Sequence, residues 1–127
     1  MINASKSIVE EMFAAFGKGD MEGFLKTVSA DTVWIYHGTQ IIPQATYKGF
    51  EGVRSFVSGI LDYADMISFE PLEYIVEGNK VVVLGQEHQR VKKTSQEQQQ
   101  KWVQVYTIKN GLIARMEEFA TSEILTK

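Results

Sequence analysis

The sequence predicts an α+β fold in which three helices cover one face of a mostly antiparallel sheet. Two patterns support this. Apolar residues recur at helical spacing in three segments of the first half of the chain, whereas from residue 67 onward they alternate with a period of two. Turn signals at residues 77–80 and 110–111 join alternating segments as hairpins, which makes neighbouring strands antiparallel. The predicted order is ααβαββββ, in a single domain over residues 1–127.

The three helical segments come early in the chain. The first runs from about Ser5 to Phe16 and is ended by Gly17 and Gly19. The second follows Asp20, a residue type that caps helix N-termini, and carries apolar residues as far as position 28. The third places apolar residues at i, i+3, i+4, i+7 and i+8 over residues 53–61.

Five segments have the composition of strands. The first, Thr32 to His37, is rich in β-branched and aromatic residues, and a loop over residues 38–49 follows it. The others span residues 67–76, 81–91, 101–108 and 112–121. Pro71 interrupts the second of the five and places that point at an edge or a bulge. The polar stretch over residues 94–98 is predicted to be a loop.

Composition excludes several classes of function. The 127 residues are 44% hydrophobic and 23% charged, as in an ordinary globular protein. The absence of cysteine rules out disulfides, thiolate nucleophiles and Cys-ligated metals. A formal charge of −3 without a basic stripe argues against a nucleic-acid partner. No segment has the pattern of a signal peptide or a membrane span, so we expect a cytoplasmic protein without a membrane partner.

Alternation along the strands assigns residues to two faces of the sheet. We expect one face to be aromatic and polar and the other to be aliphatic. The aromatic-polar face is predicted to hold Trp34, Tyr36, Leu84, Gln86, His88, Trp102, Gln104, Tyr106 and Phe119. The aliphatic face is predicted to hold Val33, Ile35, Val81, Val83, Val103, Val105, Ala114 and Met116.

A sheet that is apolar on both faces needs cover on both, and three short helices cover only one. We therefore expect the aliphatic face to form a homodimer contact, through Val83, Val103, Val105, Ala114 and Met116. The aromatic-polar face then lies under the helices. Several hydrogen-bonding groups there favour a ligand cavity over a sealed core, because unpaired buried polar groups are costly.

His88 is the first candidate for chemistry, because imidazole exchanges protons near neutral pH. The alternative is a half-buried strand histidine with no catalytic role. Tyr36 is a candidate donor to a ligand oxygen, or else a rim residue with its hydroxyl in water. His37 is interpreted as a residue of the loop mouth. Two distant histidines without thiolates do not predict a metal site.

The charged run at Arg115, Glu117 and Glu118 also has two interpretations. The simpler one is a solvated strand end, since exposed charges contribute little to stability. The functional one is a carboxylate at the mouth of the cavity.

Four motifs resemble the SnoaL-like polyketide cyclase group of the nuclear transport factor 2-like superfamily, which also holds ketosteroid isomerase and limonene epoxide hydrolase. They are Gly17-Lys-Gly-Asp20 after a helix, Asp31-x-Val-Trp34, Tyr47-Lys-Gly-x-x-Gly-Val-x-x-Phe56 and Trp102-x-Gln-x-Tyr-x-Ile-x-Asn-Gly111-x-Ile. The resemblance covers nearly the whole chain. It implies a cone-shaped, strongly curved sheet with helices that close a deep hydrophobic pocket, usually in a dimer.

The resemblance breaks at the key residues of each known activity. The cyclases carry an acid/base aspartate near the end of the last strand, where this sequence has Thr121. The arginine and aspartate of the epoxide hydrolase correspond to Gln86 and His88, and the base of the isomerase falls near Tyr36 or His37. None of these residues carries a carboxylate.

The sequence thus favours a pocket for a small, largely apolar molecule with a carbonyl or hydroxyl group. If the protein is an enzyme, we expect cofactor-independent proton transfer, with His88 and Tyr36 as catalytic residues. Ligand-binding residues are predicted to be Phe16, Trp34, Gln86, Trp102, Gln104 and Phe119. The alternative is a non-catalytic binding or dimerisation module of the same fold.

Overall fold

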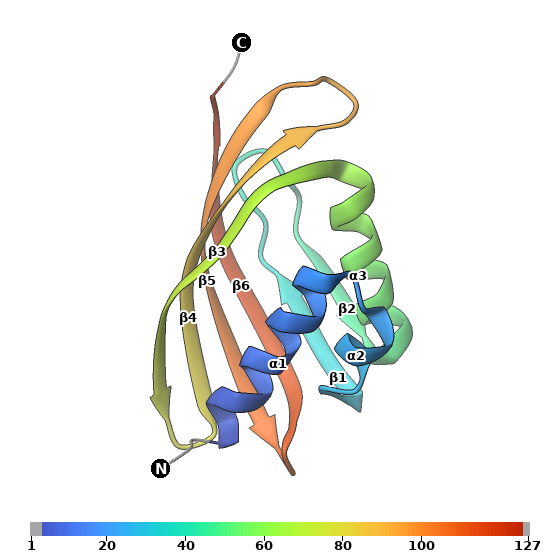
Figure 1. Cartoon of the computed structure of the whole chain (residues 1–127), viewed down its shortest axis with the longest axis vertical. Coiled ribbons are helices and arrows are strands. Elements are labelled where there is room, and N and C mark those ends of the chain that lie inside the picture. The colour runs from blue at the N-terminus through green and yellow to red at the C-terminus, as the bar shows by residue number, and fades with distance from the viewer. Residues whose placement is uncertain (1–3, 126–127) are drawn as a thin grey trace.

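The computed structural model describes residues 4–125, so the two ends of the predicted domain, residues 1–3 and 126–127, lie outside the described residues. Three helices pack on the concave side of one curved, six-stranded sheet (Figure 1). The predicted α+β class, with a mostly antiparallel sheet, is confirmed. The elements are α1 (Ala4–Lys18), α2 (Met21–Leu25), β1 (Val28–Tyr36), β2 (Ala45–Lys48), α3 (Gly49–Tyr63), β3 (Ala64–Glu77), β4 (Lys80–Val91), β5 (Glu97–Lys109) and β6 (Leu112–Ile124).

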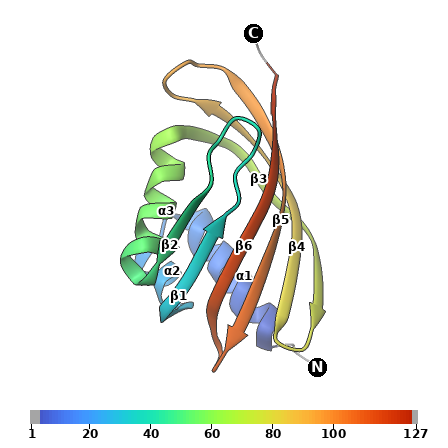
Figure 2. The same ribbon diagram turned by 180° about the vertical axis from the view of Figure 1, so that it is seen from behind.

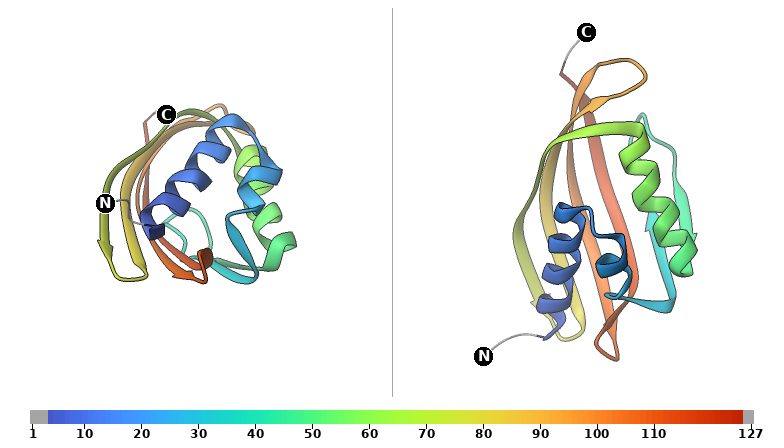
Figure 3. Two further views of the ribbon diagram at one scale, coloured as in Figure 1. Left: turned by 60° about the horizontal axis from the view of Figure 1, so that its bottom comes forward. Right: turned by 45° about the vertical axis from the view of Figure 1, so that its right-hand side comes forward.

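The sheet curls around the helices, as the end-on view shows (Figure 3). Its strand order is β2-β1-β6-β5-β4-β3. All neighbouring strands are antiparallel except β1 and β6, which run parallel. β1 and β6 are far apart in the sequence and are not joined by a hairpin. Seen from behind, the convex face carries no helix (Figure 2). Within residues 4–125, no helix is long and apolar enough to cross a membrane.

Each helix forms where its sequence pattern predicts it. The apolar stripe of α1 buries Val9, Met12 and Ala15. The side chain of Asp20 caps α2, because the backbone N–H of Gly23 donates to its Oδ1 at 3.0 Å.

The strands differ from the prediction in three places. β1 begins at Val28, which the helical pattern had assigned to the second helix. β2 lies inside the predicted loop over residues 38–49. It is a strand because it pairs with β1, and its four residues are too few to show a strand pattern in the sequence. β5 begins at Glu97, so the predicted loop over residues 94–98 is shorter than expected.

The predicted face assignment is wrong for β4. Cross-strand partners share a face of the sheet, and Val83 lies opposite Gln104 while Glu87 lies opposite Gln100. The odd-numbered residues of β4 therefore point inward. Residues 81–84 are all apolar, so alternation does not fix the phase of this strand from sequence.

The assignment is also wrong for β6, for a different reason. The pairing of β5 with β6 shifts by one residue between Thr107 and Ile108, as at a β-bulge. Beyond the shift, Met116 pairs with Tyr106 and points inward, whereas Phe119 pairs with Val103 and points outward. Met116 is fully buried and Phe119 is 47% exposed.

Gly85 makes room for a tryptophan in the inner layer. Trp102 lies directly opposite Gly85, and a Cβ there would collide with two ring carbons of Trp102 and lie 2.7 Å from the backbone oxygen of Glu70. We expect Gly85→Ala to lower the free energy of unfolding by about 1–3 kcal/mol, because overpacking forces the backbone or the ring to shift. Urea denaturation measures this change.

The matched control is Gly59→Ala in α3, where an added Cβ meets nothing within 4 Å. Alanine in a helix interior is favoured over glycine, so this variant should be unchanged or more stable. Equal stability of Gly85→Ala and the wild type would contradict the predicted packing.

Candidate active site

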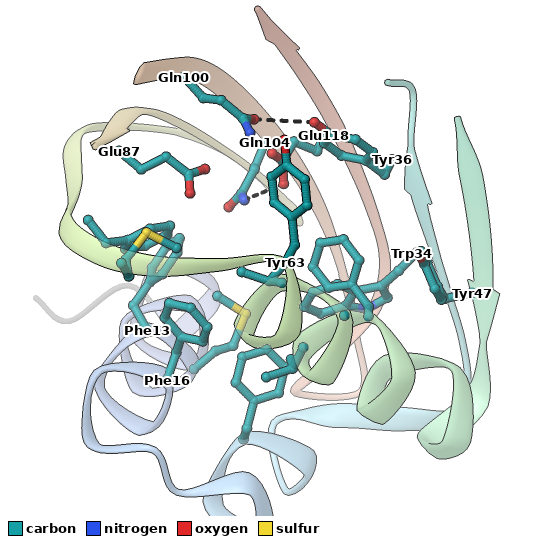
Figure 4. A pocket seen from close by; sticks show the side chains of 18 of the residues that line it. Phe13, Phe16, Trp34, Tyr36, Tyr47, Tyr63, Glu87, Gln100, Gln104 and Glu118 are labelled. Carbon is teal, nitrogen blue, oxygen red and sulfur yellow. Dashed lines mark hydrogen bonds between the residues drawn. The ribbon is translucent and has the colours of Figure 1, made fainter. Parts of the chain in front are cut away.

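A cavity of about 250 Å³ lies between the sheet and the helices. Nearly half of its lining residues are aromatic, and a set of polar side chains gathers on the wall formed by β4, β5 and β6 (Figure 4). The aromatic lining includes Phe13, Phe16, Phe24, Trp34, Phe56 and Phe69. The polar lining includes Tyr36, Glu87, Gln89, Gln100, Gln104 and Glu118.

The aromatic wall is held in place by a hydrogen-bonded tryptophan. The indole Nε1 of Trp34 donates to Thr32 Oγ1 at 3.1 Å, and this hydroxyl donates to the backbone oxygen of Ile113 at 2.9 Å. The Trp34 ring packs against Phe24 and Phe56 at centroid distances of 5.6 and 5.5 Å. Because its one polar atom is satisfied elsewhere, Trp34 presents only apolar surface to a ligand.

Glu118 is the centre of the polar wall. The amide Nε2 of Gln104 donates to its Oε1 at 2.8 Å, and the hydroxyl of Tyr106 donates to Gln104 Oε1. Glu118 is 5% exposed. Burial raises its pKa to about 7, against the opposing effect of the hydrogen bond from Gln104. This carboxyl therefore exchanges a proton near neutral pH.

Glu87 faces the same cavity from β4. It is 7% exposed, and no hydrogen bond from the described part of the chain reaches its carboxyl group. Burial, followed by the charge of Glu118, raises its pKa to about 8. At neutral pH Glu87 is mostly protonated and is a hydrogen-bond donor.

Tyr36 adds a second donor at the polar wall. Its hydroxyl donates to Gln100 Oε1 at 3.2 Å. Burial and the nearby Glu118 raise the pKa of its phenol well above the usual range, so it stays protonated at all working pH values. Figure 4 shows Tyr36, Gln100, Gln104 and Glu118 together at one side of the cavity, with Glu87 facing them.

This arrangement suits acid–base chemistry more than metal binding. Two buried carboxyl groups with raised pKa values share one largely apolar cavity, which is the setting in which one takes a proton and the other donates a hydrogen bond. Among residues 4–125, no three His, Asp or Glu side chains gather as a metal site.

The structure brings together four of the predicted site residues. Phe16, Trp34, Tyr36 and Gln104 line the cavity. Trp102 is 2% exposed and lies in the aromatic layer beside it, stacked on Phe69 with ring centroids 5.2 Å apart.

Three predicted site residues lie on the outer face and not in the cavity. Gln86 donates to Glu70 at 3.1 Å, and His88 contacts Glu97 at 2.8 Å. Phe119 stacks on His37 with centroids 4.4 Å apart. The placement of His88 and Gln86 in the pocket is wrong because the phase of β4 is opposite to the one predicted. Phe119 is displaced by the register shift between β5 and β6.

His37 also lies outside the cavity, where its Nε2 lies 3.0 Å from Glu117 Oε1. Glu117 is the neighbour of Glu118 in sequence, and the two side chains point to opposite faces of β6. The charged run had been interpreted either as a solvated strand end or as a carboxylate at the cavity mouth. Glu117 fits the first interpretation. Glu118 fits the second in part, because it lines the cavity but is buried inside it and does not lie at its mouth.

Sequence analysis missed Glu87, Gln89 and Gln100, and gave Glu118 no role in the chemistry. The signal that finds them is pairing: a hairpin places Glu118 opposite Gln104 and Glu87 opposite Gln100 once the register is known. Alternation alone does not supply it, because a buried glutamate is rare and a strand with Glu facing outward is the default.

Comparisons with known proteins agree on the fold. The family model described as SnoaL-like domain matches residues 9–116. An NTF2-like protein from Burkholderia xenovorans is 27% identical, with a TM-score of 0.83 over 92% of this chain and 88% of that one. Among curated proteins, none matches the sequence.

Two further solved structures share the fold at lower identity and contain ligands. TerC, co-crystallised with polyporic acid, is 23% identical with a TM-score of 0.78 over 92% of this chain and 91% of that one. A Mycobacterium tuberculosis protein in complex with estradiol-17beta-hemisuccinate is 16% identical, with a TM-score of 0.78 over 93% and 94%. At these identities the likeness shows the fold alone.

Proposed function

Because the chain belongs to the SnoaL-like domain family, we propose that it is a cofactor-independent proton-transfer enzyme of isomerase or cyclase type, acting on a small apolar carbonyl compound. The observation that carries the proposal is the pair of buried carboxyl groups, Glu118 and Glu87, in one aromatic cavity. The pKa of Glu118 is about 7 and that of Glu87 is about 8. Between these two pH values Glu118 is mostly ionised and Glu87 is mostly protonated, as a base and an acid must be.

In this mechanism the Glu118 carboxylate takes a proton from the carbon next to the carbonyl. The C–H electron pair moves into an enolate, whose oxygen accepts a hydrogen bond from protonated Glu87 and a second from the Tyr36 hydroxyl, which turns from Gln100 Oε1 to the substrate oxygen. Glu118 then returns the proton to carbon, at the same or a conjugated position. Gln104 holds the carboxyl group of Glu118 in place throughout, since it donates to Oε1 at 2.8 Å.

The position of Thr121 is consistent with a base elsewhere on β6. Thr121 is exposed on the outer face, opposite Lys101, and does not line the cavity. Glu118 lies three residues earlier on the same strand and faces inward. The carboxyl group that the family pattern lacks at Thr121 is thus available to the cavity from Glu118.

The ligands of related structures support the class of substrate. TerC binds polyporic acid and the mycobacterial protein binds an estradiol ester, both small molecules with a largely apolar body. The aromatic lining of the present cavity fits a ring system of that kind, and the polar wall fits one oxygen function at its end.

The test is hydrogen–deuterium exchange of 2-tetralone, an apolar bicyclic ketone, followed by proton NMR in D₂O. The enzyme is expected to accelerate loss of the signals of the protons next to the carbonyl, because Glu118 removes them and returns deuterons. A rate equal to that of buffer, with 2-tetralone shown to bind, would contradict proton transfer.

A non-catalytic binding module is the second candidate, and Thr121 in place of the family aspartate favours it. Binding without exchange in the same experiment would support this candidate.

We also propose a cytoplasmic location, since the chain has no cysteine with which to form the disulfides common in secreted domains. Fractionation of cells that produce the protein tests this proposal.

We propose in addition that the convex face forms a homodimer. Val103 and Val105 lie on this face, and Ala114 lies at the register shift without a cross-strand partner. Val83 and Met116 are fully buried inside and are not available for the contact. Leu84 and Phe119 take their places outside. A helix-free sheet face with aliphatic and aromatic side chains needs cover, and a second copy supplies it symmetrically.

Val103→Asp is expected to convert the dimer to a monomer, because the contact would bury an unpaired carboxylate on each side. Analytical ultracentrifugation measures the mass. The control is Glu11→Asp, at an exposed position of α1 and therefore away from the convex face. An unchanged dimer in Val103→Asp, or a monomeric wild type, would contradict this contact.

A further inference from the structure

Two buried side-chain amide groups lie side by side, and neither of their N–H donors has an acceptor in the described part of the chain. Gln89 on β4 and Gln98 on β5 are opposite each other in the register, 1% and 2% exposed. Among residues 4–125, the Nε2 of each has no hydrogen-bond acceptor. Buried amide donors in native proteins are nearly always paired, because an unpaired one destabilises the folded state. Two on neighbouring positions point to an acceptor that a ligand supplies.

This amide pair lies where the cavity meets a second, more open hollow. Gln89 lines the cavity and Gln98 lines the hollow, and Tyr63 from α3 lines both. The Tyr63 hydroxyl donates to Gln98 Oε1 at 3.3 Å, which leaves the Nε2 as the unpaired end of that amide. Figure 4 shows Tyr63 projecting from α3 toward the polar wall.

The charges around the hollow favour an anion at the pair. Lys92 and Lys93 line it together with one carboxylate, Asp62. Lys92 also lies 3.9 Å from Asp65, on the exposed surface. A carboxylate offers two acceptor oxygens, and hydrogen bonds from amide donors to a charged acceptor are stronger than those to a neutral one.

We propose that the substrate carries a carboxylate, remote from its reacting carbonyl, which binds between the Nε2 groups of Gln89 and Gln98 beneath Tyr63. The inference rests on the proposed function and narrows its substrate to apolar keto acids. Gln89 lies two residues along β4 from Glu87 on the same inner face, so one molecule spans both ends: its carbonyl lies near Glu118 and its acid group at the amide pair.

The test compares three probes with one aromatic body: 2-naphthol, 6-hydroxy-2-naphthoic acid and 6-hydroxy-2-naphthamide. Dissociation constants are measured by isothermal titration calorimetry at pH 6.5. The acid is expected to bind about tenfold tighter than 2-naphthol, with the amide between them. Gln89→Leu and Gln98→Leu should each reduce the ratio of the affinities for the acid and for 2-naphthol from about tenfold to near one.

The matched control is Gln99→Leu, a glutamine on the outer face opposite His88, which should retain the full advantage of the acid. Gln98→Glu serves as a second variant of nearly native volume. It should weaken binding of 6-hydroxy-2-naphthoic acid more than binding of 2-naphthol, because it replaces an amide donor by a carboxylate. Thermal melting confirms that each variant is folded.

Equal affinity for the acid and 2-naphthol would overturn the inference and leave the proposed function standing, provided 2-tetralone exchange persists. An advantage of the acid that survives both leucine variants would also overturn it, since the lysines alone would then explain the preference. Failure of all three probes to bind would overturn the inference and the proposed pocket together.

Discussion

Glu118→Gln is expected to lower the rate of 2-tetralone exchange by about 100- to 10,000-fold, the usual range for loss of a general base. Glutamine keeps the shape of the side chain and can still pair with Gln104, but it accepts no proton from carbon. The measurement is the NMR exchange rate at saturating ketone, with the fold checked by circular dichroism. A variant with the wild-type rate would remove Glu118 from the mechanism.

Glu117→Gln is the matched control for this change. Glu117 is adjacent in sequence but lies on the outer face, where His37 holds it at 3.0 Å. Its removal should leave the exchange rate nearly unchanged. Loss of activity in both variants would show that β6 had been disturbed as a whole.

The same assay has an expected pH profile. Activity should rise as Glu118 ionises, with a pKa of about 7, and fall as Glu87 loses its proton, with a pKa of about 8. The two carboxyl groups interact, so the limbs report the pair and not either residue alone. Glu87→Gln keeps a neutral donor and should flatten the falling limb; an unchanged profile in that variant would exclude Glu87 as the group that titrates there.

The second large effect is a fall in stability as pH rises from about 5 to about 8. Both carboxyl groups hold their protons more tightly in the folded protein than in the unfolded chain, where the pKa is 4.5. The folded state therefore binds more protons over this range, and the free energy of unfolding decreases with pH. Each unit of pKa difference corresponds to ~1.4 kcal/mol, so a loss of several kcal/mol is expected.

The acid side has the opposite sign. The pKa of Glu117 is lowered by its hydrogen bond with His37, and that of Glu97 by hydrogen bonds from Arg90 and His88. Their stabilising contribution is present above the unfolded pKa of 4.5 and is lost as pH falls through the lowered values. Both pairs are partly exposed, so this limb is shallow, and maximal stability is expected near pH 5.

Urea unfolding at intervals from pH 4 to pH 9 measures the curve. The double variant Glu87→Gln, Glu118→Gln should lack the decline between pH 5 and pH 8 and keep the shallow acid limb. A wild-type curve that rises over that interval would mean that the two carboxyl groups are solvated, and the argument for a proton-transfer site would fail with it.

The sequence alone determined the fold class, all three helices and five of the six strands, since these depend on local periodicity and turn chemistry. It also identified Trp34, Tyr36 and Gln104, because large aromatic and polar residues alternate with small aliphatic ones in their strands. Two local ambiguities misled it. The apolar run over residues 81–84 is compatible with both phases of β4, and the Asn110-Gly111 hairpin, extended without a bulge, places Glu117 opposite Gln104 and turns Phe119 inward.

Only the tertiary structure decided which carboxylates face the cavity. The register shift between Thr107 and Ile108 turns Glu118 inward, and pairing with β5 turns Glu87 inward and His88 outward. Burying these two glutamates opposes their own hydration, so no local preference predicts it. Cross-strand hydrogen bonding between distant segments fixes the register, and the register chooses the side chains that meet a ligand.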